Sequence, residues 1–130
     1  MKFHLVIVSW FWLVASSCNA PVYLTNGEMI YYTGENNRGE TVLNRPASRI
    51  KIVSSCRNCH GKYGDAMKNA RIGFSQLSNS SLYNPPYNDS LFFRFLDHDV
   101  KSDGTKANIG VIWNLSDSDK KDLLDFLKTL

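Results

Sequence analysis

The sequence predicts a small, mainly α-helical domain of several short helices and long loops. Residues 87–99 and 116–127 carry apolar side chains at helical spacing, and a shorter capped stretch lies at 25–34. No repeat or low-complexity tract follows the first twenty residues. A chain of 130 residues allows one core, and its ordinary apolar content with many aromatic residues indicates a globular domain.

The first twenty residues have the pattern of a secretory signal. Lys2 precedes an apolar run from Leu5 to Ala15, and small residues follow up to Ala20. The run is shorter than the roughly 20 apolar residues that a membrane-spanning helix needs. We therefore expect residues 1–20 to be a signal segment, 21–130 to be the folded domain, and the protein to leave the cytoplasm.

Two positions are candidates for the C-terminal boundary of this signal. Cleavage after Ala20 follows a small-x-small pattern, but it would leave Pro21 just past the cut. The stretch from Ala15 to Cys18 resembles a bacterial lipobox, in which Leu usually stands where this chain has Ala15. Lipidation of Cys18 would use the third cysteine and would be the protein's link to a membrane. The expected location is the periplasm, either free or anchored to a membrane that faces it.

The folded part is expected to begin with a helix and a loop. Residues 25–34 start with a cap at Thr25 or Asn26 and end at Gly34, as a short helix with a glycine exit does. Residues 35–48 are rich in turn formers around a brief β-like stretch, which predicts a loop or a small hairpin.

Two further helices are expected nearer the C-terminus. Residues 87–99 form one, with a cap at Asn88 or Asp89. The other starts at Ser116 and Asp119, a capping-box-like pair, and then presents one apolar stripe. Its acidic residues fit a solvated face that alternates with lysines: Asp117, Asp119, Asp122 and Asp125.

The intervening stretches are long for so small a domain. A helical turn is expected over residues 50–59, residues 61–86 read as mostly irregular, and 100–112 form another loop. Such loops collapse unless something central gives them a surface on which to pack.

Residues 56–60 read CRNCH and concentrate two thiols and an imidazole. A thioredoxin-like redox pair needs a βαβ context, which does not surround this motif. A structural zinc site needs four ligands, and the other histidines, His4 and His98, come without a second cysteine pair. A plain disulfide suits an oxidising compartment but leaves His60 without a role.

The remaining interpretation is covalent haem, because Cys-x-x-Cys-His is the attachment pattern of c-type haem. Cys56 and Cys59, about one helical turn apart, would bond to the two vinyl groups on one porphyrin edge. His60 would then bind the iron as an axial ligand. Export, the lack of competing ligands and the long loops agree with this reading. We therefore expect one haem c to be the hydrophobic centre, with the loops as its walls.

With these features, residues 21–130 resemble a class I c-type cytochrome with a single haem. Gly27 and Tyr31 stand four apart, like the small and aromatic pair in that family's first helix, and residues 123–127 resemble its terminal Leu-x-x-aromatic-Leu. "CHGKYGD" is similar to the family's continuation Cys-His-Gly-x-x-Gly. The resemblance implies that the first and last helices cross near the haem edge, where the glycine permits close approach.

The chain departs from that family in two places. About 20 residues, from Gly34 to Ser54, lie between the first helix and the motif, where compact members have almost none. We interpret them as an insertion along the haem edge and as a candidate docking surface. Many relatives also carry a distal Met before the last helix, but residues 106–113 read KANIGVIW and offer no such donor. The sixth iron position is then open, or is filled by His98 or Met67, and we favour the open position.

The resemblance implies electron transfer by a covalently bound haem c, in a small periplasmic carrier or in the haem subunit of an exported oxidoreductase. Its partners would be redox proteins. The missing distal Met supports an alternative, a pentacoordinate haem c that binds or senses NO or CO. No catalytic triad or pair of carboxylates stands out in the sequence, so we do not expect an enzyme with its own substrate. A net charge of +3 with scattered Lys and Arg does not suggest nucleic-acid binding.

Overall fold

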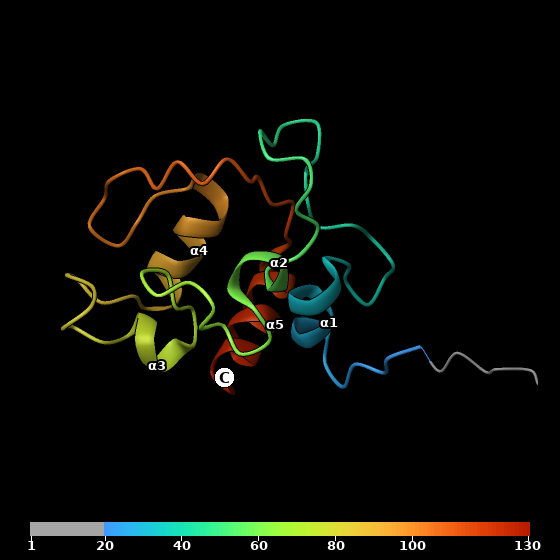
Figure 1. Cartoon of the computed structure of the whole chain (residues 1–130), viewed down its shortest axis with the longest axis horizontal. Helices are drawn as coiled ribbons and strands as arrows, with labels where there is room; N and C mark the ends of the chain where they lie inside the picture. Colours follow the sequence, from blue (N-terminus) through green and yellow to red (C-terminus); the bar gives the residue numbers. More distant parts are fainter. Residues whose placement is uncertain (1–19) are drawn as a thin grey trace, which may run out of the picture.

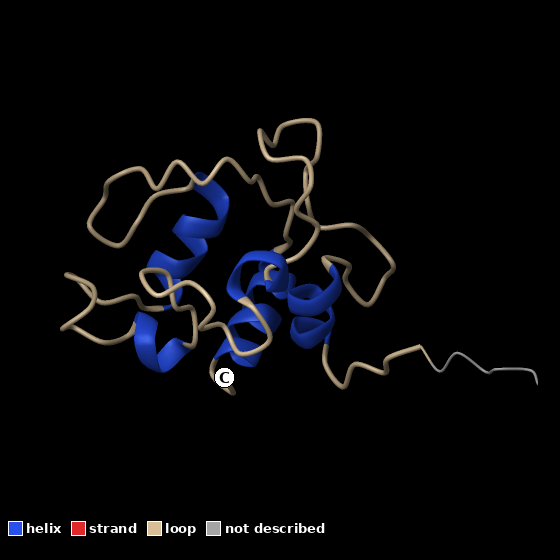
Figure 2. Ribbon diagram, viewed as in Figure 1, coloured by secondary structure: helices blue, strands red, loops and turns tan. Residues whose placement is uncertain are grey.

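The computed structural model describes residues 20–130, which form five short helices joined by loops (Figure 1). Their bounds are α1 Asn26–Thr33, α2 Arg57–His60, α3 Phe74–Leu77, α4 Asp89–His98 and α5 Asp117–Leu127. Figure 2 shows helices and loops but no strand, and within residues 20–130 the β-structure is limited to three isolated antiparallel bridges. The prediction of a small, mainly α domain is confirmed.

The predicted end signals of α1 are confirmed. The Thr25 hydroxyl accepts a hydrogen bond from the backbone N–H of Glu28 at 3.0 Å and so caps the first turn. Gly34 ends the helix with a left-handed φ of 76°, and its N–H donates to the carbonyl of Ile30 at 2.9 Å. A Cβ atom on Gly34 would lie 1.8 Å from the carbonyl oxygen of Ser54, so this turn requires glycine.

The two later helices also begin at predicted caps. Asn88, rather than Asp89, caps α4, because its side chain accepts a hydrogen bond from the N–H of Leu91 at 2.9 Å. Ser116 and Asp119 form a full capping box at the start of α5.

The core centres on the crossing of α1 and α5. A Cβ atom on Gly27 would lie 1.9 Å from the carbonyl oxygen of Asp122, so the two helix backbones are in direct contact there. One turn further along, the rings of Tyr31 and Phe126 pack with centroids 5.3 Å apart. In Figure 1, α3 and α4 lie on the opposite side of α2 from α1. The buried core residues are Ile30, Tyr31, Val42, Leu77, Tyr87, Phe92, Leu96, Leu123, Leu124 and Leu127.

Asp119 corrects the expectation that the acidic residues of the last helix form a solvated face. Its side chain is only 1% exposed and accepts hydrogen bonds from Arg38 Nη2 at 2.8 Å and Asn26 Nδ2 at 3.0 Å. Burial raises the pKa of this carboxyl, but hydrogen bonds from Ser116, Asn26 and Arg38 outweigh burial and hold the pKa below its usual range. The carboxylate therefore joins α1, the following loop and α5.

The helical turn predicted over residues 50–59 starts later than expected. Helical structure begins only at Arg57, after a segment whose N–H groups at Ser54 and Ser55 donate to the side chain of Asn58. Residues 61–86 are largely irregular as predicted, but the single-turn helix α3 within them was missed. Four residues are too few to display a helical period.

The segment from Gly34 to Ser54 is bonded to the stretch that leads into α5. An antiparallel bridge joins Glu35 to Thr41, which agrees with the predicted small hairpin, and another joins Leu43 to Trp113. The N–H groups of Arg49 and Ile50 both donate to the carbonyl of Gly110, at 2.8 and 3.1 Å. The segment from Gly34 to Ser54 is thus held by specific backbone pairing.

Predictions for the N-terminal signal fall largely outside the structure. Residues 1–19, including Cys18, lie outside the described residues. In residues 20–130, no helix has the length and apolar character needed to cross a membrane.

Candidate functional site

The CRNCH motif occupies one short helical turn. Cys56 lies at the N-cap of α2, and the N–H of His60 donates to the carbonyl of Cys56 at 3.0 Å. The Asn58 side-chain oxygen accepts hydrogen bonds from the N–H groups of Ser54 and Ser55, at 3.0 and 2.8 Å. This polar cap fixes the entry into the turn, so the sequence positions both cysteines locally.

The two thiols have different environments. Cys56 is partly buried against the hydrophobic core, and burial raises the pKa of its thiol to about 12. Cys59 is exposed to solvent. Both cysteines are free in the structure.

His60 is oriented through one ring nitrogen. Its Nδ1 lies 2.9 Å from the carbonyl oxygen of Ala70, and a carbonyl can only accept, so Nδ1 carries the hydrogen. Burial lowers the pKa of His60, and the bond to Ala70 only partly offsets that effect. The neutral imidazole therefore keeps its lone pair on Nε2, the tautomer suited to bind a metal ion.

The loop after the motif is held tightly to α1. Gly61 has a φ of 73°, and a Cβ atom there would lie 2.8 Å from the Cβ of Ala66. The hydroxyl of Tyr31 donates to the Gly61 carbonyl at 2.7 Å, and that of Tyr32 donates to the Lys62 carbonyl at 2.9 Å. The first helix thus anchors the backbone immediately after His60.

The donor set fits a haem c better than a metal ion bound by protein alone. Within residues 20–130, no three His, Cys, Asp or Glu side chains are grouped so that they could hold one ion. A structural zinc site needs four converging ligands. Covalent haem needs only two thiols one helical turn apart and one imidazole with a free nitrogen. Cys56, Cys59 and His60 meet these requirements together.

His98 lies far from the CRNCH motif in sequence and lines a pocket to which the motif does not contribute. It is the last residue of α4 and is exposed. Together with Asp97, Asp117 and Lys120 it borders a pocket between α4 and α5. Lys120 pairs there with both carboxylates, at 2.9 Å to Asp97 and 2.7 Å to Asp117.

Met67 lies on the turn that supports His60. The residue is 45% exposed, and its carbonyl accepts a hydrogen bond from the N–H of Ala70 at 2.9 Å. Because the carbonyl of Ala70 in turn accepts from Nδ1 of His60, the backbone of Met67 belongs to the same turn that supports the imidazole.

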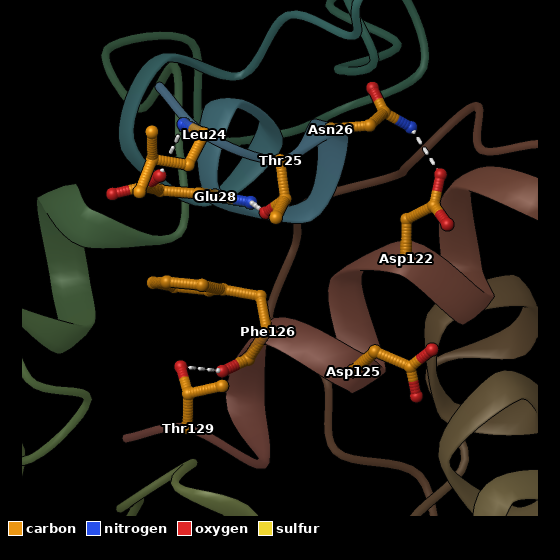
Figure 3. Close-up of a pocket in the computed structure, with 8 residues that line it drawn as sticks. All are labelled: Leu24, Thr25, Asn26, Glu28, Asp122, Asp125, Phe126 and Thr129. Carbon is orange, nitrogen blue, oxygen red and sulfur yellow. Dashed lines mark hydrogen bonds between the residues drawn. The ribbon is translucent and has the colours of Figure 1, made fainter. Parts of the chain in front are cut away.

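The cavity drawn in Figure 3 is separate from the motif. It has a volume of about 500 Å³ and lies where α1 meets α5. Its carboxylates are already engaged. Glu28 accepts from the N–H of Leu24 at 2.7 Å, Asp122 accepts from Asn26 at 2.8 Å, and Asp125 pairs with Lys121 at 2.8 Å. Its residues are Leu24, Thr25, Asn26, Glu28, Asp122, Asp125, Phe126 and Thr129.

Sequence reasoning placed Cys56, Cys59 and His60 in one site but missed the groups that hold them. The carbonyl of Ala70 has no side-chain signature, and only the fold reveals its contact with His60. Asn58, inside the motif itself, was readable as a local cap. Comparisons of the chain with known protein families, with curated proteins and with solved structures found no match.

Proposed function

We propose that the protein carries one covalently attached haem c and transfers single electrons between redox proteins. The observation that carries this proposal is the pairing of two free thiols on one helical turn with an imidazole whose Nδ1 is already bonded to Ala70. When bound, the haem supplies an iron that alternates between two oxidation states, and the chain sets its environment.

The chain's own residues have distinct roles in this proposal. Cys56 and Cys59 would hold the porphyrin through thioether bonds, and His60 would bind the iron through Nε2. The hydrogen bond from Nδ1 to Ala70 fixes the ring orientation and makes Nε2 a stronger donor. Anchoring of Gly61 and Lys62 by two tyrosine hydroxyls limits movement of this support.

An apolar surrounding supports the same proposal. Cys56 packs against the main hydrophobic cluster, which also includes aromatic side chains of α4 and of the loop before it. Low polarity around a haem is one of the means by which a protein adjusts its potential. Phe92 and Leu96 are buried, at 4% and 8% exposure, so α4 contributes to this apolar environment.

Location and partners belong to the proposal as well. The secretory pattern of residues 1–20 favours a periplasmic protein, free or held to the membrane by a lipid on Cys18. Export of the chain and attachment of haem through thioethers are consistent with each other. The partners would be other redox proteins that receive or donate the electron.

A second candidate is a pentacoordinate haem that binds NO or CO. One observation favours it. Ile109, Gly110 and Val111 stand where members of the resembled family carry a distal Met. An open sixth position admits small gases, whereas a thioether there raises the potential and suits a carrier.

The test is to express the full chain in a host with haem-attachment machinery. Denatured protein should retain a chromophore, and its mass should exceed that of the polypeptide by one haem. Sharp low-spin bands in the reduced protein would support the carrier, and a high-spin form that shifts with CO would support the gas-binding alternative. A denatured polypeptide without attached haem would overturn both.

A further inference from the structure

Positive charge is unevenly distributed and unevenly paired in this chain. Residues 41–88 contain seven Lys or Arg and a single acidic residue, Asp65. Within the described structure, none of these seven cations lies in an ion pair, whereas the paired ones are Arg38, Lys101, Lys120, Lys121 and Lys128. The unpaired group consists of Arg45, Arg49, Lys51, Arg57, Lys62, Lys68 and Arg71.

Two of these cations border a cavity of about 440 Å³. Lys68, Asn69 and Arg71 come from the loop after the CRNCH motif, and Gln76 comes from α3. Leu82 and Tyr83 complete the lining, and the Tyr83 hydroxyl lies 3.5 Å from the carbonyl oxygen of Arg71. No carboxylate lines this cavity.

We propose that this cavity binds a small organic anion, a carboxylate or phosphate group attached to an apolar body. Lys and Arg supply the positive charge, and Arg also offers a planar pair of donors that matches either anion. The carboxamides of Asn69 and Gln76 add neutral donors. Leu82, which is 56% exposed, and the Tyr83 ring provide an apolar wall. The volume lies within the usual range for small-molecule sites, roughly 300–1,000 Å³.

The cavity adjoins the support of the proposed axial ligand. Asn69 and Arg71 flank Ala70, whose carbonyl accepts the hydrogen bond from His60 Nδ1. An anion held by these neighbours would constrain the same turn. Binding of the anion does not depend on haem. Any effect of the bound anion on the iron, through His60, rests on the proposed function.

The experiment titrates the full exported protein, as purified, with benzoate and with phenyl phosphate, and follows binding by calorimetry and by amide NMR shifts. Inorganic phosphate and benzyl alcohol are the comparison probes. We expect both aromatic anions to bind and to shift the amides of residues 68–71, 76, 82 and 83. Inorganic phosphate should bind more weakly and benzyl alcohol not measurably, since each lacks one half of the recognised chemistry.

Variants identify the site. Lys68→Gln and Arg71→Gln should each weaken binding about tenfold to a hundredfold, the loss expected for one hydrogen bond to a charged group. Lys51→Gln removes one charge from the same basic region outside the cavity and should leave binding within about twofold. Leu82→Glu keeps both cations but places a carboxylate at the cavity and should abolish anion binding, while circular dichroism reports the retained fold.

Several results would overturn the proposal. One is the absence of binding by either aromatic anion. Another is binding to Lys68→Gln and Arg71→Gln that is as tight as binding to the parent protein. A third is binding of benzyl alcohol that is as tight as binding of the aromatic anions. The proposal would also be overturned if no added anion binds and Arg71→Gln shifts the spectrum or potential of the haem. That result would assign Arg71 to the carboxylates of the haem. Anion binding by protein that proves to lack haem would leave the cavity assignment intact and refute only the proposed function.

Discussion

The backbones of α1 and α5 touch at Gly27 and Asp122, where an added Cβ would lie 1.9 Å from a carbonyl oxygen. Two more backbone atoms, of Asp122 and Leu123, would lie within 2.5 and 2.9 Å of that Cβ. A methyl group at Gly27 therefore cannot be accommodated without separating the helices.

Gly27→Ala should lower the free energy of unfolding by about 1–3 kcal/mol, because overpacking outweighs the better helix propensity of alanine. Chemical denaturation of both proteins measures the difference. Ser118→Ala, at an exposed position of α5, is the control and should stay within about 0.5 kcal/mol. A Gly27→Ala protein as stable as the parent would contradict the observed crossing.

Removing the buried carboxylate with Asp119→Asn should destabilise the protein by about 2–3 kcal/mol at neutral pH, because charged hydrogen bonds from Arg38 and others are lost. The folded-state pKa of Asp119 lies below the unfolded value of about 3.9. Its contribution is therefore complete above that unfolded value and declines as the pH falls through the folded pKa.

The gap in unfolding free energy between parent and Asp119→Asn should accordingly be constant from pH 7 to about 5 and should narrow in more acidic solution. Urea unfolding at a series of pH values measures it. Asp125→Asn, which changes an exposed carboxylate, should cost at most about 0.5 kcal/mol. A gap in unfolding free energy that widens on acidification would show that folding does not lower the pKa of Asp119.

Three side chains should behave differently towards the proposed haem. His60→Ala should abolish normal holoprotein, because it removes the imidazole that Ala70 orients. His98→Ala and Met67→Leu should leave the spectrum of the reduced protein unchanged, since His98 lines the pocket between α4 and α5 and Met67 lies on the turn that supports His60. Loss of a low-spin spectrum in either variant would identify that residue as the distal ligand.

Tyr31→Phe removes the hydrogen bond to the Gly61 carbonyl and should cost about 1 kcal/mol of unfolding free energy. The ring and its packing against Phe126 remain, so the helix crossing should be preserved. Thermal or urea unfolding is the measurement. Tyr32→Phe, whose bond to Lys62 is exposed, should cost less, and the reverse order would contradict the burial of Tyr31.

The sequence was most informative where a feature depends on neighbours in the chain. Thr25, Gly34, Asn88 and the Ser116 capping box mark helix ends through contacts within a few residues, and the sequence located each of the four ends to within one residue. The three motif residues share one turn for the same reason. The close approach at Gly27 was expected from a family resemblance rather than from spacing.

Features that depend on distant segments were not readable. Asp119 looked like part of a solvated face, because nothing near it in sequence announces Arg38 or Asn26 as partners. The pairing of Arg49 and Ile50 with Gly110 uses backbone atoms that every residue possesses. Likewise, any residue could have supplied the carbonyl that Ala70 offers to His60.

The contact between α1 and α5 also governs the order of events during synthesis. Asn26 and Asp119 are 93 positions apart, so their bond closes almost the entire described chain. A ribosome-bound fragment that ends before residue 117 lacks the surface on which Ile30 and Tyr31 are buried. Native packing of α1 must therefore wait until α5 has emerged from the ribosome.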